Sequence, residues 1–203
     1  MRKDGMIAGS VFALGLAVLG GWALSQSAGP AMAEMTDGPG PNLVIEVGGA
    51  AKGEVVIDLL PDLAPKHVAQ IVKLAEEGKY NGVVFHRVID GFMAQTGDVQ
   101  YGKKDGDTSR AGMGGSDLPN IPAEFSKESF ERGVVGMARS QDPNSANSQF
   151  FIMFAPGPFL DGQYTIVGHV ISGMDVVDKI KRGEGQSGAV TDPDEMVSVT
   201  VEK

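Results

Sequence analysis

Residues 85–98, FHRVIDGFMAQTGD, constrain the fold of this chain more than any other stretch. They predict two short strands around Asp90-Gly91, a dipeptide that accepts positive φ in the two-residue turn of a hairpin. Successive side chains of a strand point to opposite faces, so the position along the strand decides which residues lie together. This stretch is therefore expected to form a β-hairpin with two distinct faces.

One of those faces holds an arginine among large apolar side chains. Alternation puts Arg87 on the same side as Phe85 and Ile89, with the amide of Gln95 nearby. Desolvating a guanidinium costs so much free energy that an arginine rarely lies among apolar groups without a task. The alternative is an arginine that lays its stem over the strand and keeps its charged head in water. The hairpin alone leaves both interpretations open.

Two further stretches decide in favour of a functional arginine. Residues 145–152, SANSQFFI, end in an apolar strand and follow 136–139, GMAR, while residues 159–164, FLDGQY, carry another Asp-Gly turn. Together with residues 85–98 they resemble the cyclophilin family of peptidyl-prolyl isomerases, which shares F-H-R-x-I-x-G-F-M-x-Q-x-G-D, N-x-S-Q-F-F-I and W-L-D-G. The resemblance extends from about Leu43 to Val201, and a 14-residue string with so many fixed types is far more specific than a short glycine pattern.

Composition is consistent with one folded domain that does not bind nucleic acid. The chain has 203 residues, 42% of them hydrophobic, which is enough for one sizeable core. Its formal net charge is −9, and no basic run is longer than Lys103-Lys104. A nucleic-acid surface needs clustered Lys and Arg, so we expect no nucleic-acid partner.

The sequence gives no reason to expect a metal or another cofactor. It contains no cysteine, which excludes disulfides, thiolate chemistry and a cysteine-based zinc site, and which suits an oxidising compartment. Its three histidines, His67, His86 and His169, are far apart and lack metal-ligand spacing.

Residues 1–33 have the pattern of a signal peptide. Arg2 and Lys3 precede an uncharged, largely apolar run over residues 7–24, and Ala31-Met32-Ala33 gives the small-x-small pattern of a cleavage site. The alternative is a retained membrane anchor, because the apolar run approaches the length of a span. Residues 34–41 then form a Gly/Pro-rich, flexible lead-in, and residues 42–203 form the isomerase-like domain.

Turn signals divide the domain into short strands and two helices. One helix should begin at Pro65 and end near Gly78, with an apolar stripe that leaves His67 on the surface. Residues 172–175 have capping-box spacing ahead of a second, short helix. Strands are expected at 42–47, 54–60, on both sides of the 90–91 turn, and at 133–139, 149–154, 164–170 and 196–201.

This pattern predicts an all-β dominated fold. Many short strands with turn signals favour a sandwich or a barrel, and the resemblance selects a closed eight-stranded antiparallel β-barrel capped by two α-helices. Side chains fill the interior of such a barrel, so the resemblance places the site on its outer surface. Phe85, Ile89, Phe150 and Ile152 are expected in the core, because they alternate with the proposed site residues.

The resemblance also assigns roles to individual residues. Arg87 matches the arginine that donates a hydrogen bond to the prolyl nitrogen, Gln95 matches the amide that orients it, and His86 receives no chemical role. Catalysis is assigned to Arg87, Gln95 and Phe92, and substrate binding to Met93, Ala138, Arg139, Gln149, Phe151, Phe159, Leu160 and Tyr164. For each apolar member of this set, ordinary core packing is the alternative interpretation.

Three of these positions depart from the best-known family pattern. Phe159 replaces a tryptophan at the groove edge, Tyr164 replaces a histidine, and Arg139 stands where asparagine is common. Because Phe159 lacks the indole N–H that the immunosuppressant cyclosporin would use, we predict weak cyclosporin binding. The aromatic ring is retained, so isomerase activity should survive, whereas Tyr164 should affect substrate preference more than catalysis.

Two functional classes follow from the resemblance. The first is an isomerase that accelerates rotation of X-Pro bonds during folding of exported proteins. This enzyme is expected in the periplasm or as a secreted protein, and the alternative is an enzyme anchored to the membrane and facing the periplasm. The second is a proline-peptide-binding module or holdase chaperone with little turnover, which would not need the cation of Arg87. The expected partners are proline-containing polypeptides; the chain is expected to be a monomer, without stable membrane contact if the signal is cleaved.

Overall fold

A computed structural model describes residues 36–203, so the predicted signal peptide lies outside the described part. The strands are β1 (Asn42–Gly48), β2 (Gly53–Leu59), β3 (Val83–Val84), β4 (Arg87–Ile89), β5 (Met93–Thr96), β6 (Val134–Met137), β7 (Phe150–Met153), β8 (Ile166–Ser172) and β9 (Glu195–Glu202). The helices are α1 (Pro65–Glu76) and α2 (Met174–Val177), with 3-10 turns η1 (Thr108–Arg110) and η2 (Pro158–Leu160). None of these helices is long and apolar enough to cross a membrane.

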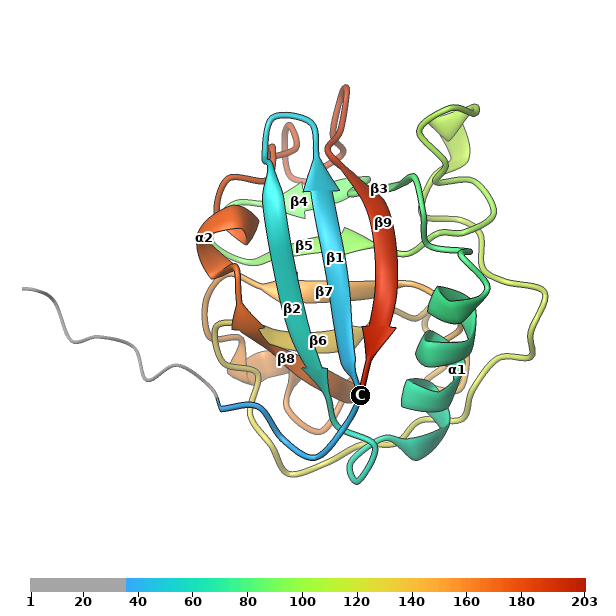
Figure 1. Cartoon of the computed structure of the whole chain (residues 1–203), viewed down its shortest axis with the longest axis vertical. Helices are drawn as coiled ribbons and strands as arrows, with labels where there is room; N and C mark the ends of the chain where they lie inside the picture. The colour runs from blue at the N-terminus through green and yellow to red at the C-terminus, as the bar shows by residue number, and fades with distance from the viewer. Residues whose placement is uncertain (1–35) are drawn as a thin grey trace, which may run out of the picture. The chain divides into compact units, whose positions relative to one another are not determined.

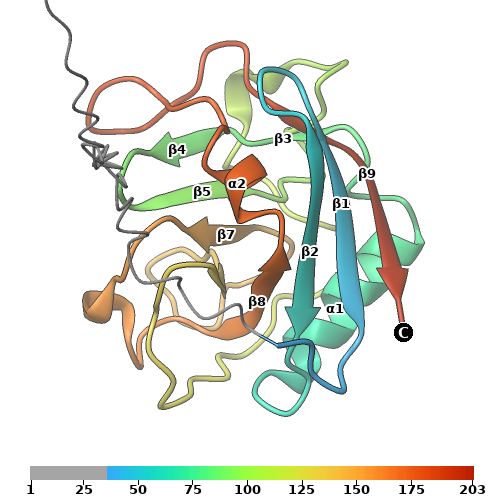
Figure 2. The same ribbon diagram turned by 60° about the vertical axis from the view of Figure 1, so that its left-hand side comes forward.

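The strands form one strongly curled, antiparallel sheet in the order β3-β9-β1-β2-β8-β6-β7-β5-β4. In Figures 1 and 2, β9, β1 and β2 form one layer and β4, β5, β7 and β6 form the other. Helix α1 packs beside β9, and α2 packs against β2 on the opposite side. The all-β dominated class with two helices is therefore confirmed.

The predicted closed barrel of eight strands is wrong, because the sheet has nine strands and stays open between β3 and β4. These edge strands are short and pair only with their inner neighbours: β3 has two residues and pairs with β9, and β4 has three and pairs with β5. Loops supply hydrogen-bond partners for the outer backbone groups of both edge strands. Val84 N–H donates to the Gly102 carbonyl over 2.8 Å, and Val88 N–H donates to the Gly188 carbonyl over 2.8 Å. Each edge is thus covered by irregular chain, which protects it from pairing with other molecules.

The main core lies between the two layers, where alternate residues of the strands point inward. Leu43, Ile45 and Val47 of β1 are all buried, as their spacing predicts. From the second layer, Phe85, Phe150 and Ile152 join the same cluster. Ile89 does not, because it pairs with Met93 and packs with it on the outer face. Its expected place in the core was therefore wrong.

Helix α1 lies on this core through the predicted stripe, but its first turn differs from the expectation. Val68, Ile71 and Ala75 are buried, whereas His67, expected on the surface, is completely buried as well. The reason is a distant partner. The Nδ1 atom of His67 lies 2.6 Å from Oε2 of Glu124, and that carboxylate also accepts the backbone N–H of His67.

Two local predictions about turns also need correction. The hairpin turn has three residues instead of two, because Phe92 N–H donates to the Ile89 carbonyl and the ladder resumes at Met93. Of the three turn residues, 90–92, only Gly91 has positive φ, at 68°. At the start of α2 no side-chain capping bond forms; Gly173 takes the N-cap position with a φ of 88°.

The described part of the lead-in, residues 36–41, runs along β2. The backbone N–H of Gly38 donates to Oδ2 of Asp58 over 3.1 Å, and the Pro41 carbonyl accepts the N–H of Leu59 over 3.0 Å. Gly40 approaches the strand so closely that a Cβ atom there would lie 2.0 Å from the Leu59 carbonyl oxygen. Only glycine fits at this position.

Candidate active site

A cavity of about 400 Å³ lies on the outer surface of β4, β5 and β7. We call it the groove, and its lining is Arg87, Phe92, Met93, Gln95, Ala138, Arg139, Phe151, Phe159, Leu160, Gln163 and Tyr164. Apart from Gln149, every site residue expected from the sequence is in this set. The structure therefore brings together residues from the hairpin, from the strand β7 and from the 158–164 segment.

The floor of the groove is a second hydrophobic cluster, separate from the main core. On β5, Met93 points outward while Ala94 joins the core, and on β7 Phe151 points outward while Ile152 joins the core. Strand alternation produces this division. Met93 and Phe151 are 2% and 5% exposed, because the 158–164 segment with Leu160 packs over them.

An aromatic pair forms one edge of the groove. The ring centroids of Phe92 and Phe159 are 5.4 Å apart and tilted by 44°. Phe92 reaches this position because it belongs to the turn and not to a strand. Phe159 is 63% exposed, so the edge offers an apolar surface to a bound molecule.

Arg87 lies at the side of the groove, half-buried, with its guanidinium held at two points. Its Nη1 donates to Oε1 of Gln95 over 3.2 Å, and its Nε donates to the Ser187 carbonyl over 3.0 Å. Within residues 36–203 no carboxylate forms an ion pair with Arg87, and its Nη2 makes no hydrogen bond. The positive charge and at least one donor are thus available to a bound molecule.

The Ser187 carbonyl is a functional contact that sequence reasoning missed. It belongs to the loop 183–188, GEGQSG, which lies against β4 through the Val88–Gly188 and Gly183–Val88 backbone bonds. No pattern in this loop indicates that it holds the arginine, because the two residues are 100 positions apart.

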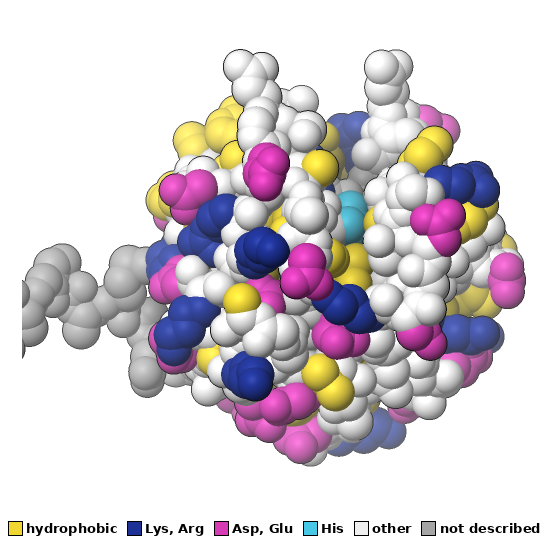
Figure 3. All heavy atoms as spheres, turned by 90° about the horizontal axis from the view of Figure 1, so that it is seen from above, with side chains coloured by type: hydrophobic (Ala, Val, Ile, Leu, Met, Phe, Trp, Pro, Cys, Tyr) yellow, Lys and Arg dark blue, Asp and Glu magenta, His cyan; other side chains and the backbone are white. Residues whose placement is uncertain are grey.

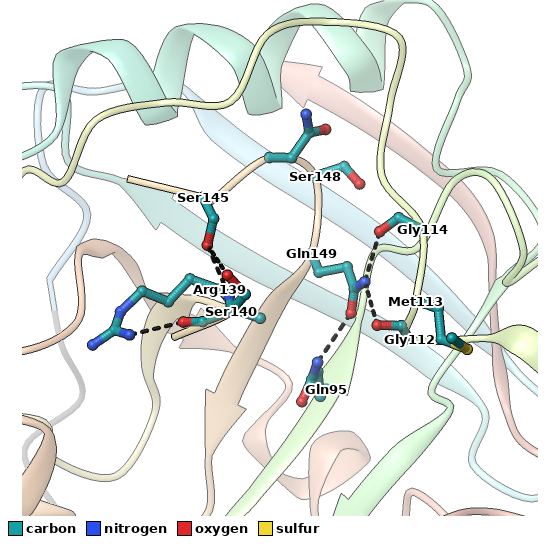
Figure 4. A pocket seen from close by; sticks show the side chains of 11 residues that line it. Gln95, Gly112, Met113, Gly114, Arg139, Ser140, Ser145, Ser148 and Gln149 are labelled. Atoms are coloured by element: carbon teal, nitrogen blue, oxygen red, sulfur yellow. Dashed lines mark hydrogen bonds between the residues drawn. The ribbon is translucent and has the colours of Figure 1, made fainter. Parts of the chain in front are cut away.

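Gln95 continues a chain of hydrogen bonds away from Arg87. Its Nε2 donates to Oε1 of Gln149 over 3.0 Å, and Nε2 of Gln149 donates to the carbonyls of Gly112 and Gly114 over 3.0 and 2.8 Å (Figure 4). Since each amide uses both its oxygen and its nitrogen, the orientation of Gln95 is fixed.

Asp98, the last residue of the hairpin motif, holds residues 112–115, GMGG, which we call the glycine-rich loop and whose carbonyls accept the hydrogen bonds from Gln149. Its buried carboxylate accepts the backbone N–H groups of Gly112 and Gly114 at 2.8 and 2.9 Å, and those of Gln100 and Tyr101 at 3.0 and 2.9 Å. Two of these four charge-assisted bonds hold the glycine-rich loop, and the other two hold the backbone that follows Asp98. The sequence places Asp98 in the motif but does not indicate this role.

A smaller, more polar cavity of about 230 Å³ adjoins the groove (Figure 4). Gln149 lines this cavity, together with residues of the glycine-rich loop and with Ser140, Ser145 and Asn147. Gln95, Ala138 and Arg139 line both cavities and so form the boundary between them. A molecule bound in the groove would therefore lie next to the polar cavity.

His86 lies under the glycine-rich loop, where its imidazole has a packing role. Burial lowers the pKa of its imidazole, although the negative charge of Asp98 acts in the opposite direction. Both ring nitrogens are buried and make no hydrogen bond to the described residues. A Cβ atom on Gly112 would lie 3.0 Å from the ring, so the imidazole fills space under the glycine-rich loop.

The described residues contain no cluster of three or more His, Asp or Glu side chains that could hold a metal ion. On the face shown in Figure 3, Lys and Arg side chains are interspersed with Asp and Glu and form no continuous basic patch. The chemistry available in the groove is hydrogen-bond donation from a cation next to an apolar floor.

Comparison with known proteins agrees with this geometry. Residues 43–201 match the family described as cyclophilin type peptidyl-prolyl cis-trans isomerase/CLD. A protein of Brucella suis, "Probable peptidyl-prolyl cis-trans isomerase", is 67% identical over 153 residues, which cover 74% of this chain and 78% of that protein. "Peptidyl-prolyl cis-trans isomerase-like 1" of Aspergillus oryzae is 39% identical over 137 residues, covering 63% of this chain and 76% of that protein.

Two solved structures are similar in fold and, more weakly, in sequence. Cyclophilin AquaCyp293 from Hirschia baltica has a TM-score of 0.66 and 29% identity, covering 81% of this chain and 74% of that one. A Cryptosporidium parvum cyclophilin type isomerase, crystallised in the presence of the dipeptide Ala-Pro, has a TM-score of 0.68 and 25% identity, covering 80% of this chain and 99% of that one.

Proposed function

The chain belongs to the cyclophilin type peptidyl-prolyl cis-trans isomerase family, enzymes that rotate X-Pro peptide bonds, and we propose that here the rotation takes place in the groove beside Arg87. One observation carries this proposal. Arg87 is a half-buried cation without a carboxylate partner among the described residues, and it lines a cavity that has an apolar floor and is large enough for a proline ring.

The reaction needs only the kind of group that the groove provides. The barrier to rotation is about 20 kcal/mol, because the nitrogen lone pair is delocalised into the carbonyl. When the amide twists, the lone pair returns to nitrogen and can accept a hydrogen bond. A donor aimed at that nitrogen therefore stabilises the twisted amide more than the planar one, and this difference lowers the barrier.

The groove positions a peptide for this interaction. The proline ring would lie on Met93, Phe151 and Leu160, which exclude water and strengthen the hydrogen bond from Arg87. The crystallisation of the Cryptosporidium parvum cyclophilin in the presence of the dipeptide Ala-Pro supports a proline-containing ligand for this fold. The chain on either side of the proline would run along Ala138 and Gln149 at the boundary with the polar cavity.

The decisive experiment compares the wild type with Arg87→Ala and Arg87→Lys on a proline-containing peptide. We expect Arg87→Ala to lower kcat/KM by about two orders of magnitude, the usual loss for one transition-state donor, with Tm nearly unchanged. Arg87→Lys keeps the charge but loses the planar fork, so a partial loss is expected. Equal rates for wild type and Arg87→Ala would reject the mechanism. If the wild type binds the peptide but does not catalyse its isomerisation, and Arg87→Ala binds it equally well, a holdase would be favoured.

We further propose that the natural clients are exported proteins and that the enzyme works as a monomer in the periplasm or after secretion. The support is the sequence pattern of residues 1–33, with a basic start, an apolar run and an A-x-A site. Cell fractionation with N-terminal sequencing tests this: a mature chain that begins near Glu34 in the periplasm is expected. Recovery of the uncleaved chain in the membrane fraction would indicate an anchored enzyme. Sedimentation at increasing concentration would test the monomer.

A further inference from the structure

Arg139 joins the two chain segments on either side of the groove boundary. Its Nη1 donates to the Ser140 carbonyl over 2.9 Å, in the segment that follows β6. Its Nη2 and Nε donate to the Gln163 carbonyl over 2.8 and 3.3 Å, in the segment that covers the floor. Nη1 also donates to the Gln141 carbonyl over 3.3 Å, so the guanidinium makes four hydrogen bonds to main-chain carbonyls with its five N–H donors.

The same guanidinium lies over an aromatic ring that continues into the floor. Its Cζ is 4.4 Å from the centroid of the Tyr164 ring, a cation–π distance. The Tyr164 ring meets Phe151 edge to face, with centroids 5.9 Å apart and an angle of 82°. Phe151 in turn stacks on Phe130 at 5.8 Å. A single stack therefore connects the arginine to the buried base of the groove.

We propose that Arg139 and Tyr164 act as one positioning pair that sets the shape of the proline-binding floor. This inference rests on the proposed function and deepens it. Arg139 acts through Tyr164 rather than on the substrate, because its donors are already engaged by the Ser140 and Gln163 carbonyls. It holds the Tyr164 ring against Phe151, and the floor is then formed before a peptide arrives.

The alternative is an arginine that merely covers apolar surface with its stem. That role would require neither the planar guanidinium nor the aromatic ring beneath it. A lysine in place of Arg139 would cover the same surface, but it would lose the bidentate contact with the Gln163 carbonyl and the flat stack on Tyr164. The two interpretations therefore predict different results for Arg139→Lys.

The test is a double-mutant cycle in the full chain with Arg139→Ala, Tyr164→Leu and both together, measured as KM and kcat for a proline-containing peptide. We expect each single variant to raise KM about three- to tenfold with kcat little changed, the range that one cation–π contact with its hydrogen bonds implies. The double variant should be no worse than the poorer single variant, because each change already removes the shared stack. Arg139→Lys should resemble Arg139→Ala, and Tyr164→Phe should resemble the wild type.

Arg132→Ala serves as the matched control. Arg132 donates to Asp178 and to the Phe154 carbonyl, and none of these residues lines the groove, so its loss should lower Tm without changing KM. Unchanged KM in Arg139→Ala, effects that multiply in the double variant, or full activity in Arg139→Lys would each overturn the positioning pair. If the wild type shows no turnover, the proposed function fails; the cycle is then measured on the dissociation constant of the same peptide, where the same coupling is expected.

Discussion

Arg87 and Gln95 lie directly opposite each other in the β4–β5 ladder, and Nη1 of the arginine donates to Oε1 of the glutamine over 3.2 Å. This contact orients the guanidinium without neutralising it, because an amide oxygen carries no net charge. A carboxylate at position 95 would hold the arginine equally well but would compensate the charge on which the proposed catalysis depends. The cross-strand pair thus combines a fixed geometry with an available cation.

Removing the Gln95 side chain should reduce catalysis while leaving the cation in place. In Gln95→Ala, the guanidinium keeps only the Ser187 contact and can rotate away from the prolyl nitrogen. We expect kcat/KM to fall about ten- to hundredfold, as misplacement of a catalytic group by about 1 Å does. Gln100→Ala is the control: its exposed side chain makes no hydrogen bond to the described residues and lines neither cavity, so activity should stay near wild type. Equal losses in both variants would contradict the orienting role of Gln95.

The loop 183–188 gives a second prediction. Gly188 has a φ of 70°, and a Cβ atom there would lie 2.5 Å from Cγ1 of Ile89. Gly188→Ala should therefore displace the neighbouring Ser187 carbonyl and lower kcat/KM severalfold.

Gly185→Ala is the control, because it introduces the same backbone strain as Gly188→Ala without displacing the loop. Gly185 has a φ of 61°, but a Cβ atom there would meet nothing within 4 Å. In both variants an alanine must adopt the left-handed backbone conformation, which should lower the unfolding free energy by about 1 kcal/mol, as measured by urea denaturation. Only Gly188→Ala should lose activity. Unimpaired catalysis in Gly188→Ala would show that the loop does not position Arg87.

The contact between Glu124 and His67 predicts an acid-sensitive fold. Burial alone would raise the pKa of the Glu124 carboxyl, but hydrogen bonds from the His67 side chain and from the backbone N–H groups of His67 and Lys66 bring it below its ordinary value. The unfolded chain therefore binds the proton more readily than the folded chain. The stability due to this carboxylate is complete above its unfolded pKa of about 4.3 and is lost as pH falls through its lower folded value.

The measurement is the unfolding free energy of wild type and Glu124→Gln between about pH 6 and about pH 3. The difference between the two proteins should shrink as the solution becomes more acidic. Glu128→Gln, at an exposed position nearby, should follow the wild type at every pH. A constant difference between wild type and Glu124→Gln would exclude the carboxylate as the acid-sensitive group.

The exposed ring of Phe159 gives a prediction about inhibition. Because Phe159 offers an aromatic surface without an N–H donor, cyclosporin should inhibit the wild type only at micromolar or higher concentration. Phe159→Trp adds the donor at a position that is 63% exposed and free to accept a larger ring. Inhibition should become tighter while kcat/KM changes little. Nanomolar inhibition of the wild type would show that the indole N–H is unnecessary in this groove.

The groove residues could be predicted because they belong to short, contiguous segments. Strand alternation decides that Met93 and Phe151 face outward while Ala94 and Ile152 face inward, and this period depends only on local backbone geometry. The motif of residues 85–98 then places Arg87 and Gln95 on the same face as Met93. Helix α1 follows from such local information, whereas the class of fold and the composition of the site were predicted from the resemblance of these segments to the cyclophilin family.

Long-range contacts decided the rest. The open sheet, the buried His67 and the Ser187 carbonyl each depend on a partner far away in the chain: Glu124 is 57 residues from His67, and Ser187 is 100 residues from Arg87. The periodicity of a segment describes its own faces but carries no information about which distant loop will cover them. For this reason the sequence alone determined the chemistry of the groove, and only the tertiary structure determined how its arginine is held.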